Sequence, residues 1–531
     1  MSKTYLIKPI SNWENSENLV KNWFSKMSEN PEKCETEKIR IVCGKEEKAD
    51  YYLIINYPND HTFYEPSKTI VIQAEPWCKE SYQNWGVKTW GFWSYPDKNL
   101  FLQVRNHKSY LNVLHWEIEK TLSELKTEKI EKNKVISTVT TSKYFDPGHK
   151  IRIDLLKYLE SKNFFIDIYG YDNNFNFKGY KGTHSLGNKN EGILPYKYYF
   201  HCENNSEYNF ITEKIWDSIL SECVIFYWGC PNISDYIDPA CYILLDSLNS
   251  EKNYEIIKTS IENNEWEKRI DRIRKQKKFI LENYNIFNVL KQIIASEEET
   301  PIYIWIHCCS KGQGLNILDE QLKRIRKSSL YNRVKKIHVG IVGNYKALDC
   351  FVSDKIKVDK IDENENETEF KTMKTFLNRY LQKESKILYI HTKGVSHPND
   401  KKSRDWRHMM EYFLIDRWET ALQKLENNDI VGCNLHLNEK EGLTPTHFSG
   451  NFWFCNGNYL EKRKDDLGKN SFFYDHSINS YKKTDIYISS NMFPSVEFWI
   501  ADSEHCKAFS LHDSKINHYF SEYDIEKYKL E

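Results

Sequence analysis

The chain has 531 residues, and its 75 Lys and Arg residues nearly balance its 76 Asp and Glu residues, for a formal net charge of −1. Hydrophobic residues at 40% and charged residues at 28% exclude bulk disorder and fibrous repeats. Near-neutral charge argues against nucleic acid as a main partner, because proteins that bind phosphate backbones usually carry a basic excess. The aromatic content of 15% favours sugar or nucleotide ligands only slightly, since aromatic rings also fill cores.

Neither a signal peptide nor a membrane span is expected. The apolar run at residues 5–7 is short, and no stretch of about 18 apolar residues occurs. The 13 Cys residues are scattered and include no CxxC pair. Scattered thiols are typical of a reducing compartment, so we expect a cytoplasmic protein in a bacterial, viral-host or eukaryotic cytosol.

Residues 1–125 are predicted to form a first α/β domain. A helical pattern of apolar residues covers 13–27. Strands are expected at 5–7, 39–43, 51–57 and 69–74. Runs that are apolar throughout are typical of a parallel sheet covered on both faces.

Residues 126–295 are predicted to form a second domain of this kind, after a charged stretch at 117–134 that we expect to be helical. Strands are expected at 135–140, 164–169, 197–202, 224–228 and 242–245, with helices at 148–159 and 211–220 and a long helical region ending at 295. This alternation predicts a doubly wound sheet. Two such domains in tandem predict two facing Rossmann-like domains with a ligand cleft between them.

Residues 301–531 are predicted to form a third, α/β domain after an acidic hinge at 296–301. Its strands are expected at 302–308, 336–342, 386–391 and 429–433, with a strong helix at 405–425. An acidic run at 362–369 is expected to be a solvated loop or the start of a helix.

The most informative segment is residues 200–217, which reads Phe-His-Cys-Glu-Asn-Asn-Ser-Glu-Tyr-Asn-Phe-Ile-Thr-Glu-Lys-Ile-Trp-Asp. A strand ends there at a polar Glu-Asn turn, and a helix is predicted to open at Thr212, a good N-cap residue. The free backbone N–H groups of that helix start, with Lys214 beside them, suit a diphosphate. A carboxylate in the same turn, that of Glu213, can accept both hydroxyls of a ribose.

This segment and the following Tyr-Trp-Gly-x-Pro turn at 227–231 resemble the signature of the α1,3/α1,4-fucosyltransferase family (glycosyltransferase family ten). The resemblance covers about residues 35–295. It implies a GT-B fold of two facing Rossmann-like domains and GDP-β-L-fucose as the donor substrate. It also places Asn204, Glu213 and Lys214 at donor-binding positions.

Two further donor-side residues follow from the same resemblance. The family has an Arg on the first helix of its nucleotide domain that meets the diphosphate, and Arg152 stands at that place. Lys150 is the competing choice, and a solvated helix position is the alternative role for Arg152. Phe210 stands where the family commonly has Tyr, so a hydroxyl contact is lost while ring stacking can remain.

The family's catalytic Glu lies just after a strand of the first domain, and Glu75 matches that position. A carboxylate at the carboxyl end of a buried strand points into the crevice where ligands bind in α/β folds. Burial beside Trp77 would raise its pKa toward that of a useful general base. Asp60 and His61 are rival candidates, and a loop Glu that caps the next helix is the structural alternative.

The resemblance implies a single displacement. Glu75 would take the proton of an acceptor hydroxyl that attacks C1 of fucose, and the anomeric configuration would invert to α. Arg152, Lys214 and helix N–H groups would offset the charge of the departing GDP in place of a metal. No Asp-x-Asp stands at a strand end in this half, so we expect no metal and no cofactor. The expected partners are the sugar nucleotide and a glycan or glycoconjugate acceptor.

The third domain lies outside that resemblance. In the segment 387–396, His-Thr-Lys stands at a strand end. Single-sheet (GT-A-like) glycosyltransferases hold Asp-x-Asp at that position, so a metal-bound diphosphate is disfavoured here. The Lys can instead bind a phosphate directly. The string at 446–454 resembles the acceptor-side Gly-Asn-Phe-Trp segments of glycosyltransferase-like domains. We expect either a second glycosyltransferase or a sugar-binding or structural domain. A second active site would use His391, Lys393, Asn451 and Glu497, with Glu497 as the base unless it is a solvent-facing helical residue.

Functions of other classes compete with this one. A nucleotide-dependent oxidoreductase is disfavoured because no GxGxxG follows the strand at 135–140. A non-catalytic carbohydrate-binding protein would keep the aromatic residues but would not need Glu75, Arg152 and Lys214 together. A glycosyltransferase that uses a different sugar nucleotide is the remaining alternative.

Overall fold

The computed structural model describes residues 3–529 with internal gaps. The gaps are 45–48, 60–61, 79–84, 184–188, 247–248, 347, 349–350, 352, 396–399, 438–444, 468–470, 476–479, 485–495 and 504, and only the backbone of 471–475 and 480–484 is described. The chain divides into two compact units, Met1–Lys291 and Gln292–Glu531. The boundary falls within helix α9 (Ile286–Glu298).

The first half of the first unit is a five-stranded parallel sheet, as the apolar runs predict. In spatial order its strands are β2 (Ile39–Ile41), β1 (Tyr5–Ser11), β3 (Tyr51–Ile55), β4 (Thr69–Gln73) and β5 (Gln103–Asn106). The predicted first helix is a helical run of α1 (Ser16–Leu19), a π-helical turn (Val20–Phe24) and α2 (Ser25–Met27). Counted along the chain, the strand order 2-1-3-4-5 is a doubly wound topology.

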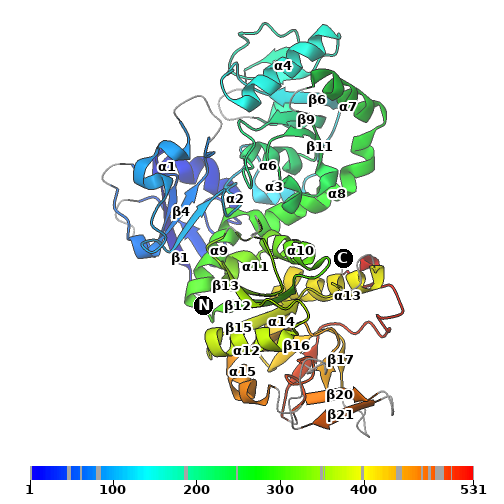
Figure 1. Ribbon diagram of the computed structural model, residues 1–531. Coiled ribbons are helices and arrows are strands. Elements are labelled where there is room, and N and C mark those ends of the chain that lie inside the picture. Colours follow the sequence, from blue (N-terminus) through cyan, green and yellow to red (C-terminus); the bar gives the residue numbers. More distant parts are fainter. Residues whose placement is uncertain are drawn as a thin grey trace. The chain divides into compact units, whose positions relative to one another are not determined.

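The second half is a six-stranded parallel sheet. In spatial order its strands are β11 (Tyr242–Leu244), β10 (Val224–Trp228), β9 (Tyr196–Cys202), β6 (Lys134–Val139), β7 (Asp167–Tyr169) and β8 (Tyr180–Gly182). This is the Rossmann order 3-2-1-4-5-6, with its switch point between β6 and β9. Figure 1 shows the sheet with helices against it, where α4 (Pro147–Ser161) lies beside α7 (Ser250–Glu262). The predicted pair of Rossmann-like domains is therefore confirmed.

The charged stretch at 117–134 is mostly not helical, contrary to prediction. Only α3 (Leu122–Thr127) forms, started by a capping box of Thr121 and Glu124. The helix buries Leu122 and Leu125, and the backbone turns extended at Glu128. Beyond that point no apolar stripe continues, so charged side chains alone supply no packing surface to hold a longer helix.

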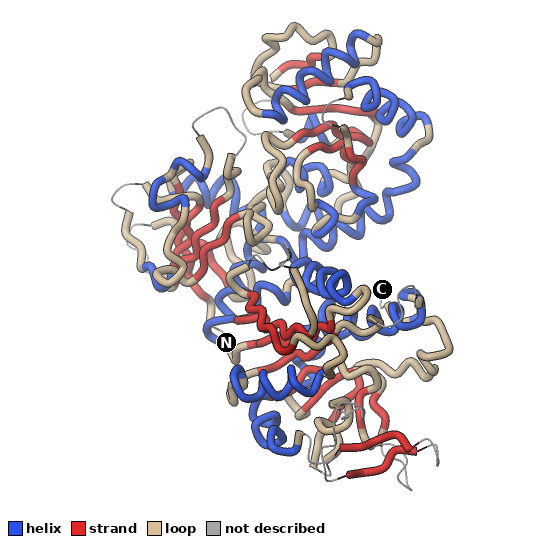
Figure 2. Tube along the Cα trace, in the orientation of Figure 1, coloured by secondary structure: helices blue, strands red, loops and turns tan. Residues whose placement is uncertain are grey.

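The second unit contains a seven-stranded mixed sheet, which confirms the predicted α/β fold of this part of the chain. In spatial order its strands are β14 (Ile356–Asp362), β13 (Val334–Val342), β12 (Ile302–Cys309), β15 (Lys386–His391), β19 (Trp453–Asn456), β16 (Ile430–Gly432) and β22 (Ala508–Ser510). Strand β19 is antiparallel to both of its neighbours. The predicted helix at 405–425 is divided into α13 (Lys401–Glu411), a π-helical turn (Tyr412–Asp416) and α14 (Trp418–Leu425). Figure 2 shows the strands of these sheets running side by side with helices outside them.

In the described part of the chain, no helix has both the length and the apolar character needed to cross a bilayer.

Candidate functional site

A cavity of about 970 Å³ in the first unit contains most of the predicted donor-side residues. Arg152, Asn204, Glu213 and Lys214 all line it. Thr140 and Asn204 follow β6 and β9, so this wall of the cavity lies at the switch point of the second sheet, where open α/β sheets bind ligands. Its volume is within the range of small-molecule sites.

Arg152 supplies a buried cation to this wall. The side chain is 5% exposed and donates from its Nη atoms to the hydroxyl of Thr140 (3.2 Å), the carbonyl of Cys202 (3.1 Å) and Oδ1 of Asn204 (3.4 Å). Its Nε has no hydrogen-bond partner, and no described carboxylate forms an ion pair with it. Burial lowers the pKa of the guanidinium. The Glu203 carboxylate attracts this charge but forms no ion pair with it. A buried charge without a close counterion is costly, so this wall is suited to an anion.

The start of α6 (Glu213–Leu220) is held by Glu203, the first residue of the Glu-Asn turn. Glu203 is 1% exposed and accepts hydrogen bonds from the backbone N–H of Thr212 (3.0 Å) and from its hydroxyl (2.9 Å). Thr212 is the N-cap residue, but its hydroxyl makes no cap hydrogen bond, contrary to the expected capping. The first-turn N–H groups of α6 therefore lack a side-chain acceptor from this residue.

The charges of Glu213 and Lys214 are already engaged. Lys214 forms an ion pair with Glu213, which also lies 3.5 Å from Lys189. Burial disfavours the charged form of Lys214, but the neighbouring carboxylates outweigh it and raise its pKa. Lys214 thus differs from Arg152, whose charge has no described carboxylate partner.

Lys189 lines the cavity together with its ion-pair partner Glu117, and sequence reasoning missed both residues. Its Nζ pairs with Glu117, Glu213 (3.5 Å) and the fully buried Asp217 (3.4 Å). Asp217 also accepts from the backbone N–H groups of Glu117 (2.7 Å) and Ile118 (3.1 Å), which precede α3. Asp217 lies in the segment 200–217, but Lys189 is 28 residues away and the two N–H donors are about 100 residues away. No local pattern could therefore have identified these partners.

Gly148 and His149 bring α4 against the Glu-Asn turn. A Cβ at Gly148 would lie 1.6 Å from the carbonyl oxygen of Glu203, so no other residue fits there. The N–H of Gly148 donates to the carbonyl of Asn204 (3.0 Å). His149 lines the cavity, and burial lowers its pKa to about 3, so the ring is neutral. Lys150 is not among the described lining residues, which favours Arg152 over this competitor.

Glu75 lies two residues after β4 and near the same charged group. Burial raises the pKa of its carboxyl, while the Lys214 ammonium offsets part of this effect and the Glu213 carboxylate adds to it. The side chain of Trp13 donates a hydrogen bond to it. Glu75 is not itself a described lining residue of the cavity. The rival candidates Asp60 and His61 lie outside the described residues.

Asn56, which sequence reasoning missed, orients the loop that carries Glu75. It is fully buried, follows β3 with a positive φ of 65°, and accepts from the N–H groups of Ala74 (2.9 Å) and Glu75 (3.4 Å) through Oδ1. Asn is one of the few residues that tolerate this backbone conformation. The Tyr51–Tyr57 run contained this signal, because an Asn directly after a buried strand is a turn residue.

The same loop is held from the second half of the unit by Glu207. Its carboxylate accepts from the backbone N–H groups of Trp77 (3.0 Å) and Cys78 (2.8 Å) and from Nε2 of His107 (2.5 Å). Glu207 lies in the segment 200–217, but its partners come from the first half of the unit.

Phe210, which was predicted to bind the donor, does not lie among the described lining residues of the cavity. It is 2% exposed and packs edge to face on His107, with ring centroids 5.8 Å apart.

The other wall of the cavity comes from the first half of the unit. Trp23 lines it and stacks on His115, with ring centroids 3.9 Å apart and planes 5° apart. Lys26 and Glu119 also line the cavity and form an ion pair (3.4 Å). This wall offers an aromatic ring beside polar side chains, a surface that suits a sugar.

In the second unit, the residues predicted for a second site gather around Glu369 at the carboxyl end of β15. Glu369 accepts from the hydroxyl of Tyr389 (2.7 Å) and the amide of Asn451 (2.9 Å), and it lies 3.5 Å from Nδ1 of His391. The other nitrogen of His391 donates to the carbonyl of Gly450 (3.0 Å). Burial lowers the pKa of His391 to about 3. Sequence reasoning missed Glu369, the residue at the centre of this group.

Glu497 and Lys393 flank this group. Glu497 accepts from the backbone N–H of Gly450 (2.7 Å). The ammonium of Lys393 lies 3.8 Å from the centroid of the Trp406 ring, and burial lowers its pKa. The structure therefore brings the four predicted residues to one edge of the sheet, although only Lys393 lines a described cavity.

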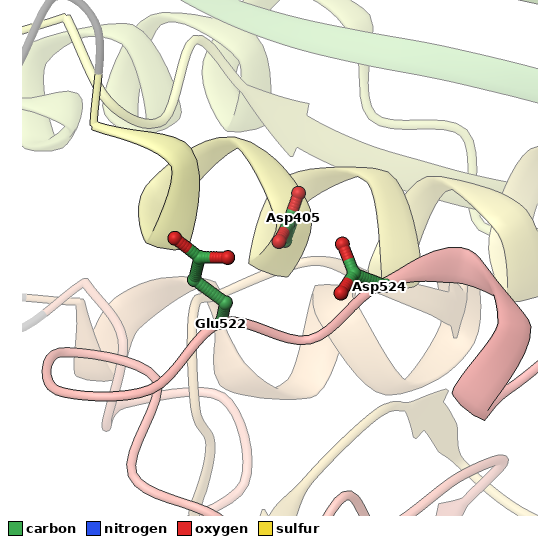
Figure 3. A group of neighbouring side chains, drawn as sticks. All are labelled: Asp405, Glu522 and Asp524. Carbon is green, nitrogen blue, oxygen red and sulfur yellow. The ribbon is translucent and has the colours of Figure 1, made fainter.

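Three carboxylates of the second unit lie close enough together to hold a metal ion: Asp405, Glu522 and Asp524. Figure 3 shows them near one another, with Asp405 on α13 and the other two on the C-terminal segment. The ammonium of Lys401 already forms ion pairs with all three, including Asp405 (2.6 Å) and Glu522 (3.0 Å). Because this cation neutralises the group, the acidic cluster supports no metal assignment.

Family models match two parts of the chain. The model described as glycosyltransferase family 10 (fucosyltransferase) C-term matches residues 129–267, and a domain of unknown function, DUF8361, matches residues 303–493. The alpha-(1,3)-fucosyltransferase FucT of Helicobacter pylori is 31% identical over 72 residues. Those residues are 14% of this chain and 14% of that protein, so the chain spans well under two thirds of this relative.

Solved structures with some likeness include two crystal structures of α1,3-fucosyltransferase. The one with GDP is 18% identical, with a TM-score of 0.30, and the match covers 54% of this chain and 92% of that chain. The one with GDP-fucose is also 18% identical, with a TM-score of 0.30, and covers 54% of this chain and 93% of that chain.

The family-10 match contains Arg152, Asn204, Glu213 and Lys214. It also spans the whole of the six-stranded sheet that positions them. Residues 129–267 are therefore a glycosyltransferase family 10 (fucosyltransferase) C-terminal domain, which this chain carries together with a DUF8361 domain at 303–493.

Proposed function

We propose that the first unit transfers L-fucose from GDP-β-L-fucose to a hydroxyl of a glycan or glycoconjugate acceptor. The observation that carries the proposal is the buried guanidinium of Arg152, which has no described carboxylate partner and lies in the wall of the 970 Å³ cavity. The match of residues 129–267 to the fucosyltransferase family model supports a sugar nucleotide as the anion.

The donor is held by cations of the chain itself. Arg152 binds the diphosphate and offsets the charge that grows on GDP as the glycosidic bond breaks. The first-turn N–H groups of α6 also bind the diphosphate. Thr212 does not cap them, and the N-terminal end of a helix attracts negative charge. Glu213 accepts the ribose hydroxyls while Lys214 keeps its carboxylate charged. These groups do the work of a metal ion, so no metal or other cofactor is needed.

The chemical step is a single displacement with inversion. The carboxylate of Glu75 takes the proton of the acceptor hydroxyl as that oxygen attacks C1 of fucose. The bond from C1 to the diphosphate oxygen breaks, its electron pair leaves with GDP, and the β-linkage of the donor becomes an α-linkage in the product. The raised pKa of Glu75 brings its basicity closer to that needed at neutral pH.

The acceptor enters from the wall formed by the first half of the unit. Trp23 offers a ring face that is held in place by stacking on His115. Polar neighbours such as Glu14 and Asn22 line the same wall and can bond to sugar hydroxyls.

The test is release of GDP from the purified full chain. We expect GDP-fucose to be consumed, slowly alone and faster with an acceptor glycan, whereas UDP- and ADP-sugars are not. Turnover of a different sugar nucleotide in preference to GDP-fucose would identify the alternative donor. Binding of glycans with no turnover of any sugar nucleotide would instead favour the non-catalytic carbohydrate-binding protein.

A further inference from the structure

A second cavity, of about 220 Å³, lies in the second unit where β12 and β15 end. Strands β13 and β14 lie on one side of β12, and β15 lies on the other. The chain therefore reverses its direction of sheet growth between β12 and β15, and parallel sheets bind ligands at the carboxyl ends of strands at such a point. Gln313 and Asn316, after β12, and Lys393 and Gly394, after β15, line the cavity.

The loop after β12 brings a helix start to this point. Gly312 has a φ of +54°, and a Cβ at Gly314 would lie 1.7 Å from the carbonyl oxygen of Cys309. Helix α10 (Gly314–Lys327) can therefore begin directly at the end of the strand. The N-cap residue Gln313 of this 14-residue helix makes no side-chain cap hydrogen bond. The partial positive charge of the first turn therefore faces the cavity without an acceptor from that residue.

Three cationic side chains line the cavity: Lys393, Arg404 and Arg407. Arg407 is 2% exposed and is held by Glu320 (2.8 Å) and Glu411 (3.3 Å), while its Nε has no hydrogen-bond partner. Within the described residues, neither Lys393 nor Arg404 forms an ion pair with a carboxylate. Lys393 instead rests on the face of Trp406.

The two carboxylates among the described lining residues of the cavity already have partners. Asp400 caps α13, accepting from the N–H groups of Lys402 and Ser403 and from the Ser403 hydroxyl (2.7 Å). Glu320 pairs with Arg407 and with His408 (2.6 Å). Glu497 and Glu369 attract the Lys393 ammonium, but no described carboxylate forms an ion pair with Lys393 or Arg404. Within the described residues, the positive charge at the cavity is therefore only partly balanced, and it lies beside the start of α10.

We propose that this cavity binds the diphosphate group of a phosphorylated ligand. The volume corresponds to roughly seven water molecules at about 30 Å³ each, which is more than a single carboxylate fills. It is less than the roughly 300–1,000 Å³ that encloses a drug-sized molecule, so any nucleoside or sugar attached to the diphosphate extends beyond the cavity. This second site does not depend on fucosyl transfer in the first unit.

The experiment is calorimetric titration of the full chain carrying Arg152→Ala, which weakens nucleotide binding in the first unit. Pyrophosphate and the diphosphates GDP, UDP, CDP and ADP are titrated separately. We expect at least one of them to bind with a single site per chain, and Lys393→Ala in the same background to weaken that binding tenfold or more. Stronger binding of one nucleoside diphosphate than of pyrophosphate identifies a nucleotide site, and equal binding identifies a site for the diphosphate alone.

Lys402→Ala is the matched control, because Lys402 lies in the first turn of α13 but does not line the cavity. It should leave the affinity within about twofold. Thermal melting of each variant checks that the second unit remains folded. An absence of binding by all five probes up to millimolar concentration, or equal losses in Lys393→Ala and Lys402→Ala, would overturn the proposal.

Discussion

Both units gather polar side chains at the carboxyl ends of parallel strands, and the two groups differ in how their charges are balanced. In the first unit, the buried guanidinium of Arg152 bonds only to neutral oxygens. In the second, the carboxylate of Glu369 already accepts hydrogen bonds from the Tyr389 hydroxyl and the Asn451 amide. Position at a strand end therefore does not distinguish a binding site from a polar core. A binding site is distinguished by side-chain charges and hydrogen-bonding groups that have no partner among the described residues of the protein.

The largest expected effect comes from Glu75→Gln. Removing the proposed base should slow fucosyl transfer by about a hundredfold to ten-thousandfold, the range attributed to general base catalysis. GDP affinity should stay within about twofold, since the amide keeps the size of the side chain. The measurement is a pair of assays, initial rate of transfer and calorimetric GDP titration. Full activity of the variant would remove Glu75 from the mechanism.

Arg152→Ala should act on binding. The loss of a charged group that bonds to phosphate should raise the dissociation constant for GDP about tenfold to a hundredfold, because such hydrogen bonds are worth about 1.5–3 kcal/mol. Lys214→Ala should weaken GDP less, since Lys214 already shares its charge with Glu213. Lys150→Ala is the control and should leave GDP affinity unchanged. A larger loss for Lys150 than for Arg152 would reverse the assignment.

Glu207→Ala tests how the halves of the first unit position the base. Without this carboxylate, the N–H groups of Trp77 and Cys78 lose their acceptor and the loop that carries Glu75 loses its anchor. We expect kcat to fall about tenfold with GDP affinity unchanged, because small displacements of a catalytic group are costly. Glu207→Gln, which keeps one acceptor oxygen, should recover part of the rate. No difference between the Ala and Gln variants would contradict a positioning role.

Tyr389→Phe tests the group around Glu369. It removes a hydroxyl that donates to a carboxylate, so it should destabilise the second unit by about 1–2 kcal/mol and lower its melting temperature by several degrees. GDP release by the first unit should not change. Tyr303→Phe, on the neighbouring strand β12, controls for loss of a hydroxyl as such. A loss of fucosyl transfer by Tyr389→Phe without a lower melting temperature would show that the residues around Glu369 take part in catalysis.

The smallest expected effect is a shift in pH dependence. Glu75 acts as a base only when deprotonated, so kcat should fall as the pH drops through its pKa, which burial raises above the ordinary value of 4.5. The Lys214 ammonium opposes this rise. In Lys214→Ala at saturating donor, the acid limb of the profile should therefore move to higher pH. A shift to lower pH would contradict the placement of Lys214 beside Glu75.

Several features of the first unit could be predicted from local pattern. Continuous apolar runs identified the parallel strands because both faces of each strand are buried, and β10 was predicted at its observed bounds. The Glu-Asn turn and the helix at Thr212 were correctly located. The role of the Thr212 hydroxyl was not, because this hydroxyl donates to Glu203 and accepts no hydrogen bond from a helix N–H group. The prediction of a helix over 117–134 was wrong, because charged side chains without an apolar stripe supply no packing surface to stabilise a helix.

The sequence by itself did not predict β5, β8, β14, β19 or β22. It did locate most strands of the first unit, the resemblance to glycosyltransferase family ten, and Arg152, Asn204, Glu213 and Lys214 as neighbours of one crevice. All of these depend on short-range spacing or on residues directly after strands. Only the tertiary structure decided which charged side chains form ion pairs or hydrogen bonds with other residues. Lys189 forms an ion pair with Asp217, which is separated from it by 28 positions in the chain. Glu207 accepts a hydrogen bond from Trp77, which is separated from it by 130 positions. Ion pairs and burial depend on such distant partners, and a linear pattern carries no record of them.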